Sequence, residues 1–131
     1  MSGAPDTSTY KAAALFDVNN SKTTYAYNAT AKMYPASITK IMTALVAIES
    51  ADLSEEVTVE VDSSDFAADE QTCGIHKGDK LTLEALLNGL LLYSGNDNAE
   101  AIAYYIGGSI EGFADMMNKK AQELMASFFT P

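Results

Sequence analysis

The spacing of the apolar residues changes at Pro35, and this change limits the folds open to the chain. Before Pro35, apolar residues form two short runs, over 11–18 and 24–28, on either side of a polar turn at 19–22. Two short runs around a turn of Asn and Ser predict a β-hairpin. The first run is almost continuously apolar and is expected to be buried, whereas the second alternates and is expected to be half-exposed.

Beyond Pro35 the apolar residues recur with the 3.6-residue period of amphipathic helices. Helices are predicted over about 37–50, from Thr82 as N-cap to an interruption at 93–96, from about 97 to a stop at 107–108, and from Ser109 onward. The residues expected to face the core are Ile38, Ile41, Met42, Leu45, Val46, Leu83, Leu86, Leu87, Leu90, Leu91, Ala99, Ile102, Ala103, Ile106, Phe113, Met116, Met117 and Leu124.

Between the first two helices, Val57, Val59 and Val61 alternate with polar residues and predict a short strand. The polar segment 62–78 after it predicts a loop. Strands followed by a run of helices place the chain in the α+β class. The length of 131 residues fits a single domain, expected over 11–131, with residues 1–10 as a flexible lead-in.

Charge and composition exclude several classes of function. The chain has 18 acidic residues against 8 lysines, so a nucleic-acid partner is not expected, because phosphate backbones would be repelled. No apolar run reaches the roughly 18 residues of a membrane span. A single cysteine, Cys73, excludes an internal disulfide, and the first residues lack the features of a signal peptide.

The clearest chemical signal is the segment Ser37-Ile38-Thr39-Lys40 at a predicted helix start. Residues i and i+3 share one face of a helix, so Lys40 is expected to place its amine beside the Ser37 hydroxyl. A serine hydroxyl becomes a nucleophile when a neighbouring base takes its proton, and a helix N-terminus offers N–H groups to a developing oxyanion. Taken alone, the same residues also fit an N-cap serine followed by an exposed lysine.

A second motif, Ser94-Gly95-Asn96, lies at the predicted interruption between two helices. Its residues also suit a polar turn between helices. An S-x-x-K segment followed by an S-x-N element belongs to the signature of penicillin-binding proteins and β-lactamases. Both elements occur here in the right order, each at its expected structural position.

Longer segments carry the same signal, and the sequence resembles the serine D-alanyl-D-alanine carboxypeptidases, the low-molecular-mass penicillin-binding proteins of peptidase family S11. The similar segments are 14–18, 33–45 (MYPASITKIMTAL), 81–98 (LTLEALLNGLLLYSGNDN) and 107–124. The resemblance implies a β-lactamase/transpeptidase-like fold that is incomplete. The hairpin would belong to the central sheet, and the helices would form a cluster that carries both motifs.

The resemblance also implies roles for four residues. Ser37 would be the acylated nucleophile, Lys40 would take its proton, and Ser94 would relay a proton to the leaving D-alanine amine. Asn96 would bind the substrate peptide and order Lys40. The implied reaction removes the terminal D-alanine from peptidoglycan stem peptides through an acyl-enzyme, with no metal or organic cofactor. β-Lactams would acylate the same serine.

The third motif of the family, K-T-G or H-T-G, has no match after Asn96. The chain is therefore expected to hold roughly the first half of a catalytic domain and to be weakly active or inactive by itself. The resemblance implies export to the extracytoplasmic cell envelope, with the signal peptide already removed. Because an isolated hairpin is marginally stable and has unpaired edges, the chain is expected to form a homodimer through its exposed strands.

Two alternative functions fit the same residues. A β-lactamase would share the chemistry, but Gly95 replaces the aspartate of the S-D-N element, and the flanking segments resemble carboxypeptidases. A non-catalytic remnant would only bind cell-wall peptide. Outside the motifs, Cys73 is expected to be a half-buried thiol and His76 an exposed side chain. The acidic residues Asp62, Asp65, Asp69 and Glu70 are expected to form a solvated face rather than a calcium site.

Overall fold

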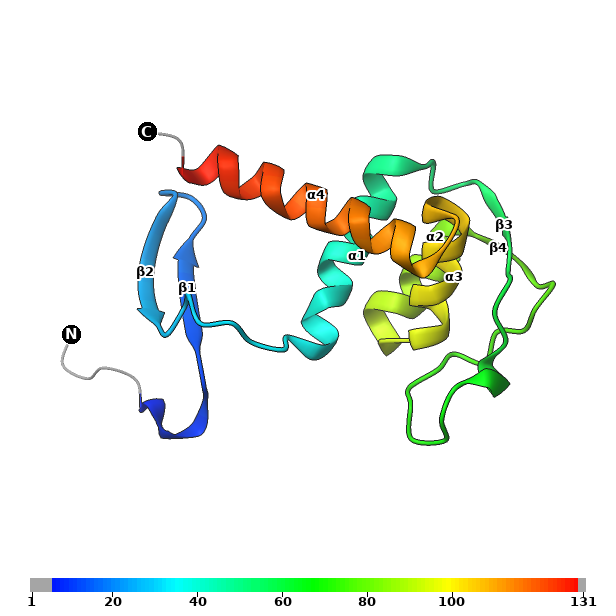
Figure 1. The fold of residues 1–131 in the computed structure, drawn as a ribbon, viewed down its shortest axis with the longest axis horizontal. Helices are drawn as coiled ribbons and strands as arrows, with labels where there is room; N and C mark the ends of the chain where they lie inside the picture. Colours follow the sequence, from blue (N-terminus) through cyan, green and yellow to red (C-terminus); the bar gives the residue numbers. More distant parts are fainter. Residues whose placement is uncertain (1–5, 130–131) are drawn as a thin grey trace. The chain divides into compact units, whose positions relative to one another are not determined.

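The computed structural model describes residues 6–129, and the chain divides into two compact units, Met1–Tyr34 and Pro35–Pro131. Figure 1 shows the order of the elements, with a hairpin in the first unit and four helices and a small sheet in the second. Part of the predicted lead-in, residues 1–5, lies outside the described residues. The rest of the lead-in includes a 3-10 turn, Thr7–Thr9, which the Asp6 side chain caps.

The first unit is an antiparallel hairpin of β1 (Ala13–Asp17) and β2 (Lys22–Tyr27), which confirms the predicted hairpin. The carboxylate of Asp17 accepts hydrogen bonds from the backbone and the side-chain amide of Asn20. These bonds close the turn that the polar residues predicted, in the manner typical of Asp and Asn at turns.

The prediction that the first strand is buried is wrong. Leu15 is 58% exposed and Phe16 is 64% exposed. Within the described residues, β1 and β2 pair only with each other. A two-stranded sheet has no second layer of its own, so the apolar side chains of β1 face water.

The second unit is a cluster of four helices, α1 (Thr39–Ser50), α2 (Leu83–Asn88), α3 (Asn96–Gly107) and α4 (Ile110–Phe129). Helix α3 contacts each of the other three. The predicted apolar stripes meet in this cluster and supply most of its core, which includes Val46, Leu83, Leu86, Leu90, Ile102 and Phe113, each at most 4% exposed. The helical part of the predicted core is therefore largely confirmed.

Three residues of the predicted stripes are an exception, because Ile38, Ile41 and Leu91 are 69%, 66% and 52% exposed. Helix α1 packs against α3 and α4 through a face that includes Val46 of the predicted stripe but not Ile41. The residues of α1 on that buried face are Thr43, Ala44, Val46 and Ala47. Small side chains let the helices approach closely, and the larger isoleucines are left on the outer side.

A small antiparallel sheet joins β3 (Glu56–Thr58) to β4 (Lys80–Thr82), with Val57 opposite Leu81. The alternation predicted β3, and Val57 and Val59 are both 1% exposed. Strand β4 was not predicted, because three residues are too few to show a period. Thr82 accepts a hydrogen bond from the Ala85 backbone and caps α2, as predicted.

The connection from α2 to α3 is abrupt. Helix α2 continues into a π-helical turn, Gly89–Tyr93, and the chain then reverses at Ser94, whose φ of 62° is left-handed. Helix α3 begins two residues later at Asn96. The predicted interruption at 93–96 is thus confirmed as a tight turn. A non-glycine residue in this conformation is strained, and such residues gather at functional sites.

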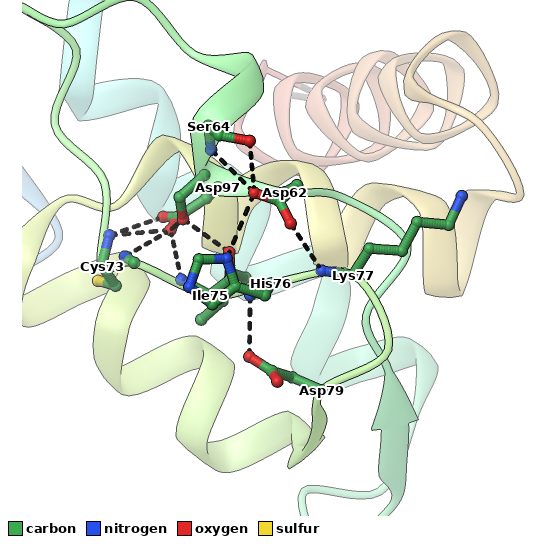
Figure 2. Close-up of polar contacts among 10 residues, drawn as sticks. Asp62, Ser64, Cys73, Ile75, His76, Lys77, Asp79 and Asp97 are labelled. Carbon is green, nitrogen blue, oxygen red and sulfur yellow. Dashed lines mark hydrogen bonds and ion pairs between the residues drawn. The ribbon is translucent and has the colours of Figure 1, made fainter.

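The loop between β3 and β4 is fastened to α3 by the carboxylate of Asp97, which is fully buried. This carboxylate accepts hydrogen bonds from the backbone N–H groups of Cys73, Gly74 and Ile75 and from the Ser63 hydroxyl, at 2.7–3.3 Å. Figure 2 shows several of these bonds, including those from Cys73 and Ile75, converging on Asp97. Because a buried charge is stable only when its oxygens have partners, the loop and the helix hold each other in place.

The hydrogen bonds also set the pH dependence of this contact. Burial acts to raise the pKa of Asp97, but the bonds from Cys73, Ser63 and Ile75 favour the charged form more strongly, so its pKa lies below the usual value. A lowered pKa in the folded state adds stability above the unfolded pKa. That stability is lost as the pH falls through the folded value. Hydrogen bonds from Ser64 and His76 likewise lower the pKa of Asp62 in the same loop.

We expect Asp97→Asn to lower the free energy of unfolding at pH 7 by about 2–3 kcal/mol, because its amide turns N–H donors toward the N–H donors of the loop. The loss of stability between about pH 5 and pH 2 should also be smaller in the variant than in the unaltered chain. Urea unfolding followed by circular dichroism measures both effects. Asp69→Asn, an exposed change in the same loop, is the control. Equal losses in the two variants would contradict the anchoring role.

Candidate active site

Ser37 and Lys40 lie at the entrance of α1. Ser37 is exposed within the 3-10 turn Ala36–Ile38, which leads directly into the helix, and Lys40 is half-buried in the first helical turn. The predicted helix start at 37 is therefore a 3-10 turn that becomes α-helical at Thr39. Ala36 has a left-handed φ of 48°, so a tight backbone turn precedes the serine.

The two predicted motifs meet through their serines. The Ser94 hydroxyl donates a hydrogen bond to the Ser37 hydroxyl, with 3.1 Å between the two oxygens. The two residues are 57 positions apart in the sequence. The left-handed turn at Ser94 and the packing of the π-helical turn against α1 bring them together.

A second pair joins the same two motifs. The Lys40 amine donates to Oδ1 of Asn96 at 2.7 Å, and Nδ2 of Asn96 donates to the Glu70 carboxylate at 3.1 Å. In the described part of the chain, no hydrogen bond links Lys40 directly to Ser37. Two hydrogen bonds thus connect the motifs. The first residues, Ser37 and Ser94, pair with each other, and so do the last residues, Lys40 and Asn96.

An open pocket of about 350 Å³ lies over this arrangement. It is lined by Ser37, Ile38, Lys40, Ile41, Leu90, Leu91 and Ser94. The exposed apolar residues of the predicted stripes, Ile38, Ile41 and Leu91, therefore border the two hydroxyls and the amine. Apolar surroundings reduce the screening of polar interactions. The electrostatic interactions of a bound substrate with the two hydroxyls and the amine would therefore be strengthened.

Gly95, between Ser94 and Asn96, is required by close packing. A Cβ atom at this position would lie 2.3 Å from Oδ1 of Asn98 and 2.8 Å from Sγ of Cys73. Both distances are far below a normal contact, and φ of Gly95 is an ordinary −63°. The glycine thus serves close approach rather than a special backbone conformation, and this turn leaves no space for an aspartate side chain.

Sequence reasoning missed two residues near the site. Glu70 was assigned to a solvated face; its side chain is exposed, but it also binds Asn96. Asp97 was treated only as a residue of a helix start, and its burial depends on loop residues more than 20 positions away. Asp97 gave no signal of burial, because an acidic residue in a first helical turn is common. Glu70 gave no signal either, because nothing in the sequence pattern distinguishes it from its acidic neighbours.

The remaining candidates lie outside the pocket. His76 is exposed as predicted, and its ring contacts the Asp62 carboxylate at 3.3 Å. Asp62 is not simply solvated, because it also accepts bonds from Ser64 and from the Lys77 backbone and so shapes the loop (Figure 2). The Cys73 thiol is exposed rather than half-buried. Partial burial and the nearby charge of Asp97 raise the pKa of this thiol, which makes it less reactive.

Two further properties of the described residues bear on the function. Over these residues, no group of three or more His, Cys, Asp or Glu side chains is arranged to hold a metal ion. Among the described helices, none is both long enough and apolar enough to cross a membrane.

Known proteins are similar to this chain in both sequence and structure. The D-alanyl-D-alanine carboxypeptidase family, Peptidase_S11, matches residues 1–127. The chain is 38% identical over 117 residues to D-alanyl-D-alanine carboxypeptidase DacF of Bacillus subtilis, an alignment that covers 87% of the chain and 30% of the relative.

Solved structures agree with the sequence match. Penicillin binding protein 6B from Escherichia coli superposes with a TM-score of 0.75 at 31% identity, over 82% of this chain and 37% of that protein. A D-alanyl-D-alanine carboxypeptidase from Mycobacterium tuberculosis superposes with a TM-score of 0.76 at 33% identity, over 86% of this chain and 42% of that protein. The fold is therefore that of the penicillin-binding proteins, as the resemblance implied.

The chain spans about a third of the length of the curated relatives that it matches. The family match covers residues 1–127, and this range includes both motifs that meet at the pocket. The chain thus belongs to the D-alanyl-D-alanine carboxypeptidase family, peptidase family S11.

Proposed function

We propose that this chain carries the nucleophile of a serine carboxypeptidase that removes the terminal D-alanine from peptidoglycan stem peptides. The proposal depends on one observation, the pairing of Ser37 with Ser94 and of Lys40 with Asn96. This pairing gathers a nucleophile, a base and a second hydroxyl around one pocket, and it hydrogen-bonds the base to an amide. The names of the relatives, which are D-alanyl-D-alanine carboxypeptidases, supply the substrate.

In the first step, the Ser37 hydroxyl oxygen attacks the carbonyl carbon of the bond between the two terminal D-alanines. Lys40, in its neutral form, takes the hydroxyl proton. The negative charge on the carbonyl oxygen would be stabilised in part by the backbone N–H of Ser37, at the start of the helical segment.

In the second step, the tetrahedral intermediate collapses to an ester between Ser37 and the shortened peptide. The leaving D-alanine amine receives a proton through the Ser94 hydroxyl, whose position 3.1 Å from the Ser37 oxygen supports this relay. Asn96 keeps Lys40 in place and hydrogen-bonds the substrate peptide. Water then hydrolyses the ester, and the free Ser37 hydroxyl is restored.

The proposal extends to ligands and location. β-Lactams would acylate Ser37 in place of the peptide, in keeping with the name of a structural neighbour, penicillin binding protein 6B. The reaction would take place at the cell envelope, where peptidoglycan lies. The net charge of −10 argues against a nucleic-acid partner.

The 131-residue chain by itself is proposed to react slowly, because no K-T-G or H-T-G follows Asn96 in it. The family resemblance implies that this third motif binds the substrate carboxylate and supplies an oxyanion donor. Removal of one oxyanion donor typically slows an enzyme by about 10²–10³-fold. A labelling assay must therefore run over hours and be compared with an intact relative.

Ser37→Ala is expected to abolish covalent labelling by a fluorescent penicillin, because the attacking oxygen is removed. Gel fluorescence and intact-protein mass spectrometry measure the labelling. The control is Ser54→Ala, an exposed serine in a loop that contributes nothing to the pocket. Stoichiometric labelling of the Ser37 variant would rule out this nucleophile.

The same preparation separates the alternatives. Release of D-alanine from a peptide ending in D-Ala-D-Ala would support the carboxypeptidase, and rapid hydrolysis of a chromogenic cephalosporin would support a β-lactamase. The absence of labelling in the unaltered chain, even over hours, would favour a remnant that only binds.

Lys40→Ala is expected to slow acylation by roughly 10²–10⁴-fold, because the hydroxyl proton loses its acceptor. The melting temperature should change little, since a half-buried lysine adds little to the core. Lys80→Ala is the matched control, because Lys80 is an exposed lysine that pairs with Glu56. Acylation of the Lys40 variant at the unaltered rate would remove this lysine from the mechanism.

We further propose that the chain forms a homodimer through its hairpin, because Leu15, Phe16 and Val18 are 58%, 64% and 85% exposed. Size-exclusion chromatography with light scattering should give twice the mass of one chain. Phe16→Lys is expected to give a monomer. The control Leu92→Lys, at an exposed position in the second unit, should remain dimeric. A monomeric unaltered chain at high concentration would contradict the proposal.

A further inference from the structure

The side-chain amide of Asn96 lies between two charged residues. Its Oδ1 accepts a hydrogen bond from the Lys40 amine at 2.7 Å, and its Nδ2 donates one to the Glu70 carboxylate at 3.1 Å. An asparagine amide has an oxygen that only accepts and an NH₂ group that only donates. The amide has two orientations, related by a 180° flip, and only one of them turns the oxygen toward Lys40.

Lys40 selects that orientation by itself only while it is protonated. An ammonium group has three donors and no acceptor, so it demands the oxygen. A neutral amine has a lone pair as well as N–H groups, so it can pair with either end of the amide. The neutral amine is the form that the proposed mechanism requires, and in this form a second group must hold the amide.

Glu70 meets that requirement. A carboxylate only accepts hydrogen bonds, so it admits the NH₂ end of Asn96 and repels the oxygen end. Its selection does not depend on the protonation of Lys40. The flipped orientation would set two acceptor oxygens against each other, at the loss of a hydrogen bond to a charged group.

The backbone that follows Glu70 is held against the start of α3. The Asn96 N–H donates to the carbonyl of Gln71 at 2.8 Å, which fixes the residue next to Glu70 against the start of α3. Asp97 holds the segment 73–75 that follows. These contacts favour the position beside Asn96.

We propose that Glu70 is a positioning residue, whose carboxylate keeps the amide of Asn96 turned so that Oδ1 faces Lys40. Its effect on catalysis rests on the proposed function, but its contact with Asn96 does not. The two parts are therefore tested by separate measurements on the same 131-residue chain.

The contact is tested by NMR. The side-chain ¹⁵NH₂ signals of Asn96 are identified as the pair that disappears in Asn96→Asp. Glu70→Ala is expected to displace these signals and to speed their exchange with water on the order of tenfold, the effect of losing one hydrogen bond to a charged acceptor. Glu100→Gln is the control, because it removes a neighbouring negative charge and leaves the bond between Glu70 and Asn96 in place. Unmoved signals in Glu70→Ala, or equal displacement in the control, would overturn the proposal.

The consequence is tested by the acylation rate at saturating penicillin. Glu70→Ala is expected to lower it roughly tenfold. Glu70→Gln should recover part of the rate, because its amide still offers an oxygen to Nδ2 of Asn96, and Glu100→Gln should keep the full rate. Displaced Asn96 signals together with an unchanged rate would overturn the positioning role. If the unaltered chain does not acylate at all, the proposed function fails, and the NMR comparison still decides the role of Glu70 in orienting Asn96.

Discussion

Three backbone N–H groups and a serine hydroxyl of one loop converge on the carboxylate of Asp97, and the arrangement of the site depends on this contact. A loop without regular structure has many backbone groups to satisfy, and a buried carboxylate needs several donors. The loop supplies the donors that the carboxylate needs, and the carboxylate supplies acceptors for the backbone N–H groups of the loop. The loop is thereby fixed beside the first turn of α3, where Gln71 and Glu70 reach the backbone and side chain of Asn96.

The turn before α3 depends on a second constraint, which is space. The Asn98 side chain lies against Gly89 and Gly95, and a Cβ atom at either glycine would come within 2.4 Å of it. The π-helical turn and the left-handed Ser94 form in the same short segment. With the backbone in this conformation, the Ser94 hydroxyl donates its hydrogen bond to Ser37. The strain at Ser94 is thus tied to its place in the site.

The exposed apolar residues belong to two separate settings. Ile38, Ile41 and Leu91 border the pocket that contains the hydroxyls, whereas Leu15 and Phe16 lie on the hairpin of the other unit. Large exposed apolar patches on proteins often mark binding sites. The chain aligns with about a third of the length of its curated relatives. These surfaces can therefore be compared with the whole proteins only over that part.

Much of the architecture could be predicted from the sequence, because it depends on local patterns. The hairpin followed from two apolar runs around a polar turn, and the helices followed from the 3.6-residue period and from the caps at Thr82 and Ser109. The motifs Ser37-x-x-Lys40 and Ser94-x-Asn96 were visible as residue types at fixed spacing. The family could also be identified from the sequence, because the similar segments are long.

Other features were decided by tertiary structure. Which face of α1 is buried depended on how closely α3 and α4 approach it, so Ile38 and Ile41 were wrongly assigned to the core. The burial of Asp97 and the contact of Glu70 with Asn96 required a loop more than 20 residues away in sequence to fold back onto α3. Periodicity reports only which neighbours along the chain share a face. Contacts between distant segments depend on packing and on donors and acceptors that meet only in the folded chain.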